Sequence, residues 1–140
     1  MYGPGSIYAP DGSFAGQVRA GKAPLVGGGH SVFSFTHAED AARAVVAALD
    51  RSHVSGALNV VDDSPAPLSD WLPRYAELVG GPKPKHAPAM LARLAVGSWG
   101  VAFMNELRGA DNARARLRLN WRPRFISLAD GFIADQAQAD

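Results

Sequence analysis

Two glycine-containing stretches have residue types and spacings that bind phosphate in other proteins. Residues 16–22 have the spacing GxxxxGK, in which backbone amides and a lysine hold phosphate groups. The next residue, Ala23, has no hydroxyl for a magnesium ion, and the stretch falls within and after an expected helix. Residues 27–29 are glycines without the GxGxxG continuation of a dinucleotide site. We therefore interpret the first stretch as a helix C-terminus followed by Gly21, and the second as a tight turn.

The histidines and the potential nucleophiles form no recognisable catalytic or metal-binding pattern. The chain has no cysteine, which excludes thiol nucleophiles, disulfides and cysteine-bound zinc and favours a cytoplasmic location. The GxSxG motif of serine hydrolases is absent as well. The four histidines lie in four separate segments, without the i, i+4 spacing of a helical zinc site: His30, His37, His53 and His86. We predict no metal ion and no catalytic residue in this sequence. We interpret His37 as a cap at a helix start, and the alternative is that it faces a pocket.

Length and charge fit one ordinary domain without a highly charged partner. The chain has 140 residues, of which 47% are apolar, and a net charge of +1. Six basic residues fall within residues 108–124, but on a helix Arg114 and Arg118 share a face while Arg116 points away. The apolar segment 87–104 is interrupted by Arg93 and by two glycines, so it is too short to span a bilayer. We therefore expect neither nucleic acid nor a membrane as a partner.

The elements that must position any site follow an α/β pattern with few short strands and a helical second half. Strands are predicted over 24–26, 32–36 and 57–61. In the first half, helices are predicted over 14–20 with Ser13 as N-cap, over 39–49, and from a cap at Ser69 or Asp70 towards Gly80. In the second half, they are predicted over 89–108 with a weak point at 97–100, over 112–119, and from Ser127 onward. Residues 82–88 are predicted to be a linker, with no strand in the half that follows. Three strands are too few for a complete doubly wound sheet, which indicates part of a larger fold.

Five motifs follow one another over nearly the whole chain: YGPG at 2–5, LVGGG at 25–29, FSFTHAEDAARAVVAAL at 33–49, ALNVVDD at 57–63 and LNWRPRF at 119–125, before Gly131-Phe132. In this order they resemble the C-terminal part of the NAD(P)-dependent epimerase/dehydratase family, the extended or atypical short-chain dehydrogenases. The resemblance implies the C-terminal part of a Rossmann-type NAD(P)-binding fold, with residues 1–140 as a single substrate-binding lobe. It also implies that the turn at Trp121 and Pro123 folds the C-terminus back onto this lobe. Asn120 stands where the family often has glycine, and asparagine tolerates the left-handed conformation.

The same resemblance suggests where a cofactor would lie. In the family, YGPG follows the strand that passes the nicotinamide, so Tyr2, Gly3 and Pro4 resemble residues beside the reactive end of NAD or NADP. The family's glycine-rich cofactor motif and its YxxxK pair are absent from this sequence. We therefore expect a C-terminal fragment, a split subunit or a truncated gene product, which binds the cofactor only with a missing N-terminal Rossmann half. We expect no hydride transfer by this chain alone, because the elements that position the cofactor are missing.

The expected substrate is a small organic molecule other than a nucleotide sugar. Nucleotide-sugar members of the family often carry an arginine where Phe33 stands, and phenylalanine cannot hold a phosphate. With the apolar run 90–104, this favours an uncharged or apolar substrate, bound by Phe33 and His37, with Arg108 as the candidate for an anionic group. The alternative for Phe33 is simple packing in a core.

Two functions remain open at this point. The first is the substrate-binding half of an NAD(P)-dependent oxidoreductase or epimerase, with a separate Rossmann half as partner. The second is a non-catalytic module that binds a small ligand or a protein. A chain without its other half would expose an apolar face, and such a face favours a homo-oligomer.

Overall fold

A computed structural model describes residues 1–139 of the chain. The chain divides into two compact units. Unit 1 comprises Met1–Ser6, Ser34–Pro65 and the segment from Ala110 onward, and unit 2 comprises Ile7–Phe33 and Ala66–Gly109. The predicted α/β class is confirmed, because few short strands are combined with several helices and the second half is mainly helical. Within residues 1–139, no helix is both long and apolar enough to cross a bilayer.

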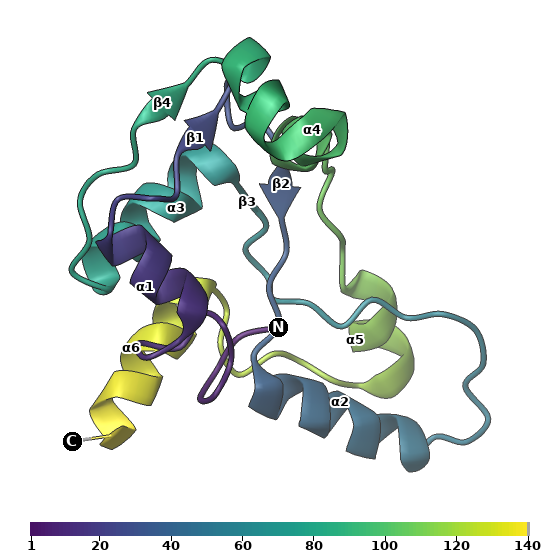
Figure 1. Ribbon diagram of the computed structural model, residues 1–140. Helices are drawn as coiled ribbons and strands as arrows, with labels where there is room; N and C mark the ends of the chain where they lie inside the picture. The colour runs from purple at the N-terminus through teal and green to yellow at the C-terminus, as the bar shows by residue number, and fades with distance from the viewer. Residues whose placement is uncertain (140) are drawn as a thin grey trace. The chain divides into compact units, whose positions relative to one another are not determined.

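Unit 2 is built from two pairs of very short strands and three helices. Strand β1 (Leu25–Val26) runs parallel to β4 (His86–Ala87), and β2 (Val32–Phe33) runs antiparallel to β3 (Ala66–Pro67) (Figure 1). Helix α1 (Ser13–Arg19) packs against α3 (Leu68–Leu78), and α4 (Ala89–Asn105) packs against β1. The core holds apolar side chains from most of these elements: Ala15, Val18, Leu25, Val26, Leu68, Trp71, Leu72, Tyr75, Ala76 and Ala92. Strand β4 lies inside the predicted linker, so the prediction of a plain linker at 82–88 is wrong there.

The start of α3 shows why its predicted cap is wrong. The helix begins at Leu68 with Pro67 at the N-cap, and no side chain caps it. Its first amides instead donate to backbone carbonyls of the segment between β1 and β2, from Leu68 to Ser31 at 2.8 Å and from Ser69 to Gly29 at 3.1 Å. Carbonyls from another segment therefore satisfy donors that a local cap satisfies in an isolated helix. Helix α1 likewise begins one residue early, with Gly12 at its N-cap in place of Ser13.

The glycine stretches of unit 2 form turns. Gly21 has a φ of 68° just after α1, and its amide donates to the carbonyl of Val18 at 2.9 Å. The GxxxxGK stretch is therefore a helix end, as interpreted from the sequence. Gly27 and Gly29 have φ values of 61° and 62° and turn the chain out of β1. A Cβ on Gly29 would lie 3.2 Å from the amide nitrogen of Ser69, so this turn is packed against protein.

Helix α4 is interrupted where the sequence predicted a weak point. Gly97 has a φ of 72° and a ψ of 177°, which separates two helical segments. The helix also leaves large apolar side chains exposed, with Met90, Leu94 and Trp99 at 82%, 88% and 75% of their accessible surface. Exposed apolar side chains of this kind are typical of surfaces that contact other protein.

Unit 1 consists of three helices and long connecting segments. Helix α2 (Ala38–Leu49) packs against α5 (Ala113–Leu119), and α6 (Leu128–Ala139) ends the described chain (Figure 1). A cluster of buried side chains joins α2, α5 and the turn after α5: Ala44, Ala115, Leu119 and Trp121. Helix α5 is followed by its C-cap Asn120, which has a φ of 47° in the left-handed region as the sequence predicted.

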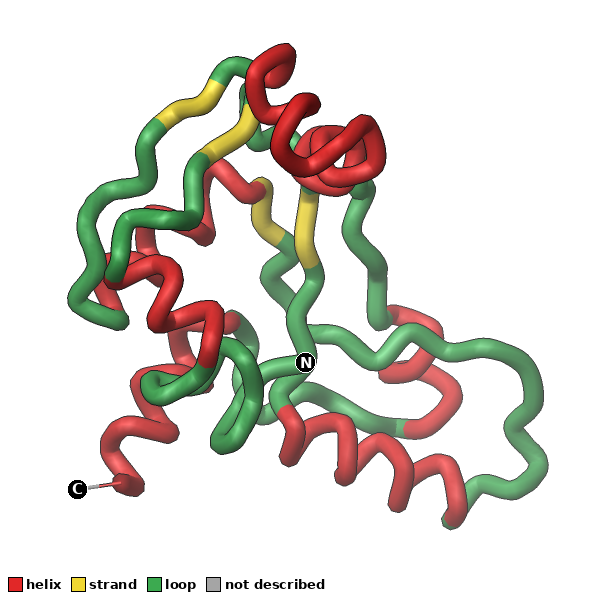
Figure 2. The backbone as a smooth tube through the Cα atoms, in the orientation of Figure 1, coloured by secondary structure: helices red, strands yellow, loops and turns green. Residues whose placement is uncertain are grey.

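The strand predicted over 57–61 is wrong. Figure 2 shows the segment between α2 and β3 as loop. Leu58 and Val60 still pack against the cluster of Ala44, Ala115, Leu119 and Trp121, so the apolar side chains of this segment contribute to the core of unit 1. Its carbonyls are bound by side chains in place of a neighbouring strand, since the hydroxyl of Thr36 donates to Val60 at 2.6 Å and Nδ2 of Asn112 donates to Val61 at 2.8 Å.

Candidate functional site

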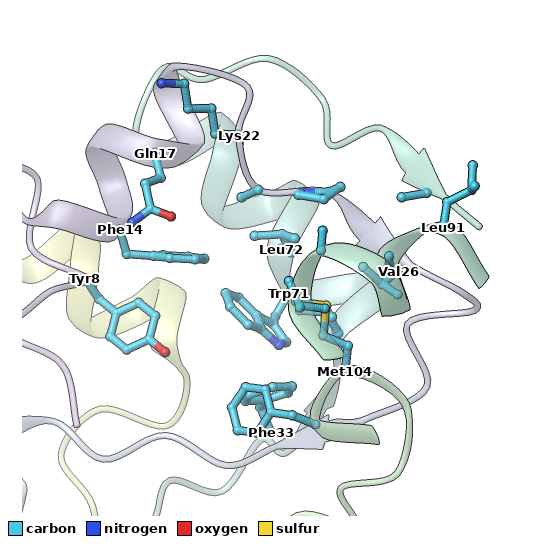
Figure 3. A pocket seen from close by; sticks show the side chains of 18 residues that line it. Tyr8, Phe14, Gln17, Lys22, Val26, Phe33, Trp71, Leu72, Leu91 and Met104 are labelled. Carbon is cyan, nitrogen blue, oxygen red and sulfur yellow. The ribbon is translucent and has the colours of Figure 1, made fainter. Parts of the chain in front are cut away.

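An apolar cavity of about 510 Å³ lies within unit 2. It is enclosed by α1, α3, α4 and the strands between them, and Figure 3 shows its lining side chains. Most of the lining is aromatic or aliphatic: Tyr8, Phe14, Val26, Phe33, Leu68, Trp71, Leu72, Leu91, Val96, Phe103 and Met104. A mostly apolar cavity of this size with few polar groups is typical of a small-molecule site.

Aromatic rings form one wall of the cavity. The ring of Phe33, on β2, meets the rings of Trp71 and Phe103 edge-on, with centroids 5.4 Å away in both pairs. The ring of Phe14 lies 6.2 Å from that of Trp71 and stacks on Tyr75 at 5.6 Å. Such pairs each contribute roughly 0.5–1.5 kcal/mol beyond the burial of their area, so the wall is held in place before any ligand arrives.

Two polar residues of unit 2 hold segments of this wall. The hydroxyl of Ser31, which is fully buried, donates to the carbonyl of Phe103 at 2.7 Å and accepts from the amide of Leu107 at 2.9 Å. This pair of bonds ties the end of α4 to the segment that leads into β2. The hydroxyl of Tyr75 donates to the carbonyl of Tyr8 at 2.8 Å, and burial raises the pKa of Tyr75 to about 12, so it stays a donor at neutral pH.

The polar groups that line the cavity come mainly from α1 and the turn after it. Gln17 and Lys22 contribute to the lining, and Figure 3 shows the Lys22 side chain at the edge with its ammonium directed away from the rings. Among the described lining residues, Lys22 is the only one with a charged side chain. Burial raises the pKa of the Tyr8 phenol, which keeps this lining group protonated.

Both halves of α4 border the cavity. Leu91 and Val96 precede Gly97, and Phe103 and Met104 follow it. The backbone of Gly97 is in a region that only glycine adopts readily, and a Cβ there would meet no other heavy atom within 4 Å. The bend therefore comes from the backbone of this residue and allows one helix to border two sides of the cavity.

A second set of buried polar groups lies in unit 1, around Tyr2 and His37. The imidazole of His37 accepts from the amide of Glu39 through Nδ1 at 3.2 Å, and its Nε2 lies 3.1 Å from Oδ1 of Asp135. Because Nδ1 accepts, Nε2 carries the proton and donates to the carboxylate. His37 thus caps α2, the interpretation favoured from the sequence, and its side chain is 5% exposed. Both ring nitrogens of His37 are therefore hydrogen-bonded within unit 1.

The Tyr2 side chain belongs to the core of unit 1. It is 1% exposed, and its hydroxyl donates to the carbonyl of Ser127 at 3.0 Å. Burial raises the pKa of Tyr2 well above its ordinary value, and the Asp62 carboxylate raises it further. Gly3 is buried with a φ of 123°, and a Cβ on it would lie 3.1 Å from Nε2 of His37. Of the three residues predicted beside the cofactor, only Pro4 is exposed.

Neither of the two glycine stretches singled out in the sequence forms a phosphate-binding loop. The GxxxxGK stretch is occupied by α1 and its C-terminal turn. The turn at 27–29 is filled, because a Cβ on Gly27 would lie 2.9 Å from Oδ1 of Asn105. No grouping of three or more potential metal ligands occurs among residues 1–139.

The structure brings one of the three predicted substrate residues to the cavity. Phe33 lines it, whereas Arg108 is exposed outside the lining and His37 lies in unit 1. Sequence reasoning missed Tyr8, Phe14 and Trp71 as lining residues. The spacing of Trp71 and Tyr75 on one helix face was available as a signal, but it is equally typical of core packing.

Asp40 is a buried carboxylate whose position the sequence analysis also missed. Its Oδ1 accepts from the amide of Arg124 at 2.7 Å and its Oδ2 from the amide of Phe125 at 3.1 Å. Nε1 of Trp121 donates to the Asp40 carbonyl at 3.2 Å. These bonds hold the turn after α5 against the start of α2, and the sequence showed Asp40 only as an acidic residue in a first helical turn.

Comparison with known proteins relates the sequence to a reductase. No family model matches the sequence. A 3-diazoavenalumate denitrifying reductase from a Streptomyces species is 47% identical over 131 residues. The matched region covers 94% of this chain and 43% of the relative, so the chain spans less than half of the relative's length.

Solved structures match over nearly the whole chain. A protein of unknown function from Silicibacter pomeroyi has a TM-score of 0.76 and 28% identity, covering 98% of this chain and 46% of that protein. The human epimerase family protein SDR39U1, solved with NADPH, has a TM-score of 0.68 and 22% identity, covering 91% of this chain and 42% of that protein. The chain has the fold of the C-terminal part of the epimerase/dehydratase family. The resemblance stated from the five sequence motifs is therefore confirmed.

Proposed function

We propose that this chain supplies the substrate-binding part of an NAD(P)-dependent oxidoreductase that acts on a small aromatic molecule. The observation that carries the proposal is the cavity of about 510 Å³ with its wall of Phe33, Trp71 and Phe103. The sequence relative supports the reaction class, because it is named as a reductase of 3-diazoavenalumate. An apolar ligand would gain roughly 25 cal/mol for each Å² of apolar surface that the cavity buries.

The cofactor in this proposal is NAD or NADP, held by residues outside these 140. The described residues provide no phosphate-binding loop, and the chain corresponds to 43% of the reductase and 42% of the NADPH-bound human protein. A Rossmann half, either in the same polypeptide or as a separate subunit, would bind the dinucleotide. The contribution of residues 1–140 is to bind the substrate and keep water from its apolar part.

A titration of the protein with NADH and NADPH, followed by nicotinamide fluorescence, tests whether the dinucleotide binds outside these 140 residues. We expect these 140 residues to bind neither dinucleotide, and we expect binding when the Rossmann half encoded with them is present. Tight binding by the 140 residues alone would overturn the proposal, since it would require a dinucleotide site in this chain. Failure of the complete protein to bind either dinucleotide would favour the second candidate, a non-catalytic module that uses the same apolar cavity.

A further inference from the structure

We propose that the cavity of unit 2 selects a planar aromatic acid and that Lys22 pairs with its carboxylate. The proposal rests on the proposed function, because it names the substrate class of the same cavity. It assigns one end of the cavity to an aromatic ring and the other end to an anionic group.

The ring end is defined by a cluster of aromatic side chains that contact one another and line the cavity. In Figure 3 the rings of Tyr8, Phe14, Trp71 and Phe33 lie around the open part of the cavity. Phe33 and Trp71 meet edge-on at 5.4 Å, and both rings line the cavity. Offset and edge-to-face contacts favour a planar aromatic ligand over an aliphatic one of equal size.

The charged end follows from the composition of the lining. No aspartate or glutamate occurs among the described lining residues, and Lys22 is the one lysine or arginine there. A single ammonium at the edge of a mostly apolar cavity favours an anionic ligand over a cationic one. The ligand is therefore an acid, with its carboxylate at the α1 side of the cavity, where the Gln17 amide is a further donor.

Lys22 is able to reach the ligand without a change in the fold. Its side chain is exposed at the edge of the cavity, and in Figure 3 the ammonium points outward. The four-carbon stem of lysine rotates freely, so a bound carboxylate can draw the ammonium inward. Arg108, which the sequence analysis named for an anionic group, is not part of the lining, and Lys22 takes that role in this proposal.

The test uses two ligands of the same shape that differ in charge, 2-naphthoate and 2-naphthamide. Their affinities are measured by isothermal titration calorimetry at pH 7 and low salt, without dinucleotide. The variant Lys22→Met keeps the aliphatic stem and removes the charge. Lys83→Met is the matched control, because Lys83 is also exposed and lies outside the lining.

We expect the unmodified protein to bind 2-naphthoate more tightly than 2-naphthamide. Lys22→Met should lower the affinity for 2-naphthoate about fivefold, as expected for the loss of a partly solvated ion pair. The affinity for 2-naphthamide should not change. Lys83→Met should change neither affinity. Added salt should lower the affinity for 2-naphthoate only, because it screens the ion pair.

Three results would overturn the inference. Equal binding of the two ligands would exclude charge selection, and an unchanged 2-naphthoate affinity in Lys22→Met would exclude Lys22 as the partner. Binding of neither ligand would exclude the cavity as an aromatic site. Because the assay contains no NADH or NADPH, its failure is distinguishable from failure of the proposed redox function, which the nicotinamide titration reports.

Discussion

Replacing Asp62 by asparagine should remove a pH dependence of folding that this buried carboxyl creates. Asp62 is 3% exposed, and its Oδ1 accepts a long hydrogen bond of 3.4 Å from the amide of Phe35. Its Oδ2 is buried and meets no donor at hydrogen-bonding geometry within the described part of the chain. Burial raises the pKa of Asp62 from 3.8 to about 6, and the amides of Phe35 and Ser64 oppose this only in part.

The sign and the size of the effect follow from this pKa. Between the unfolded value of 3.8 and the folded value of about 6, the folded state binds more protons than the unfolded state. The stabilisation that Asp62 contributes is therefore complete below pH 3.8 and is lost as the pH rises through 6. A difference of this size corresponds to on the order of 2–3 kcal/mol in the free energy of unfolding.

Urea unfolding at several pH values between 4 and 7 measures this effect. The free energy of unfolding of Asp62→Asn, relative to the unmodified protein, should shift in favour of the variant by about 2 kcal/mol from pH 4 to pH 7. Asp50→Asn serves as the control, because Asp50 is exposed and belongs to the same unit, and it should show no such shift. Parallel pH curves for Asp62→Asn and the unmodified protein would refute the reasoning.

Two further substitutions test features that position the cavity and the turn after α5. Gly97→Ala should lower the free energy of unfolding by about 1–3 kcal/mol, because a φ of 72° with a ψ of 177° is strained for any residue with a Cβ. The control Gly16→Ala, at an exposed helical position with open space, should be neutral or stabilising, and equal effects of the two would contradict this account. Asp40→Ala should cost about 3 kcal/mol in urea unfolding, because two buried amides lose their acceptor. Arg43→Ala removes the exposed partner of the same carboxylate and should cost less than about 1 kcal/mol, and a similar loss in both variants would show that the ion pair matters more than the amides.

Local rules predicted the elements that depend on residues close together in the sequence. The helices near 39–49 and 112–119 were found from apolar spacing and helix propensity, and their bounds in the structure differ by one residue. The left-handed residues Gly21 and Asn120 follow each helix as expected, because a helix end requires a residue that tolerates positive φ. The order of five short motifs was enough to identify the fold. Phe33 lines the cavity, and its role in binding a substrate stays a prediction.

The remaining features depend on contacts between segments that are far apart in the sequence. The segment 57–61 has strand composition but forms loop, because side chains of Thr36 and Asn112 bind its carbonyls. The start of α3 is set by carbonyls of Gly29 and Ser31, and β4 exists because β1 lies beside it.

The cavity also depends on contacts between segments that are far apart in the sequence. The sequence alone determined an α/β chain with the fold of the C-terminal part of epimerase/dehydratase proteins. Only the tertiary structure decided that Phe33 shares a cavity with Trp71 and Lys22 and not with Arg108. Helix and turn preferences act over a few residues, whereas a cavity is made by the packing of segments whose approach no local rule encodes.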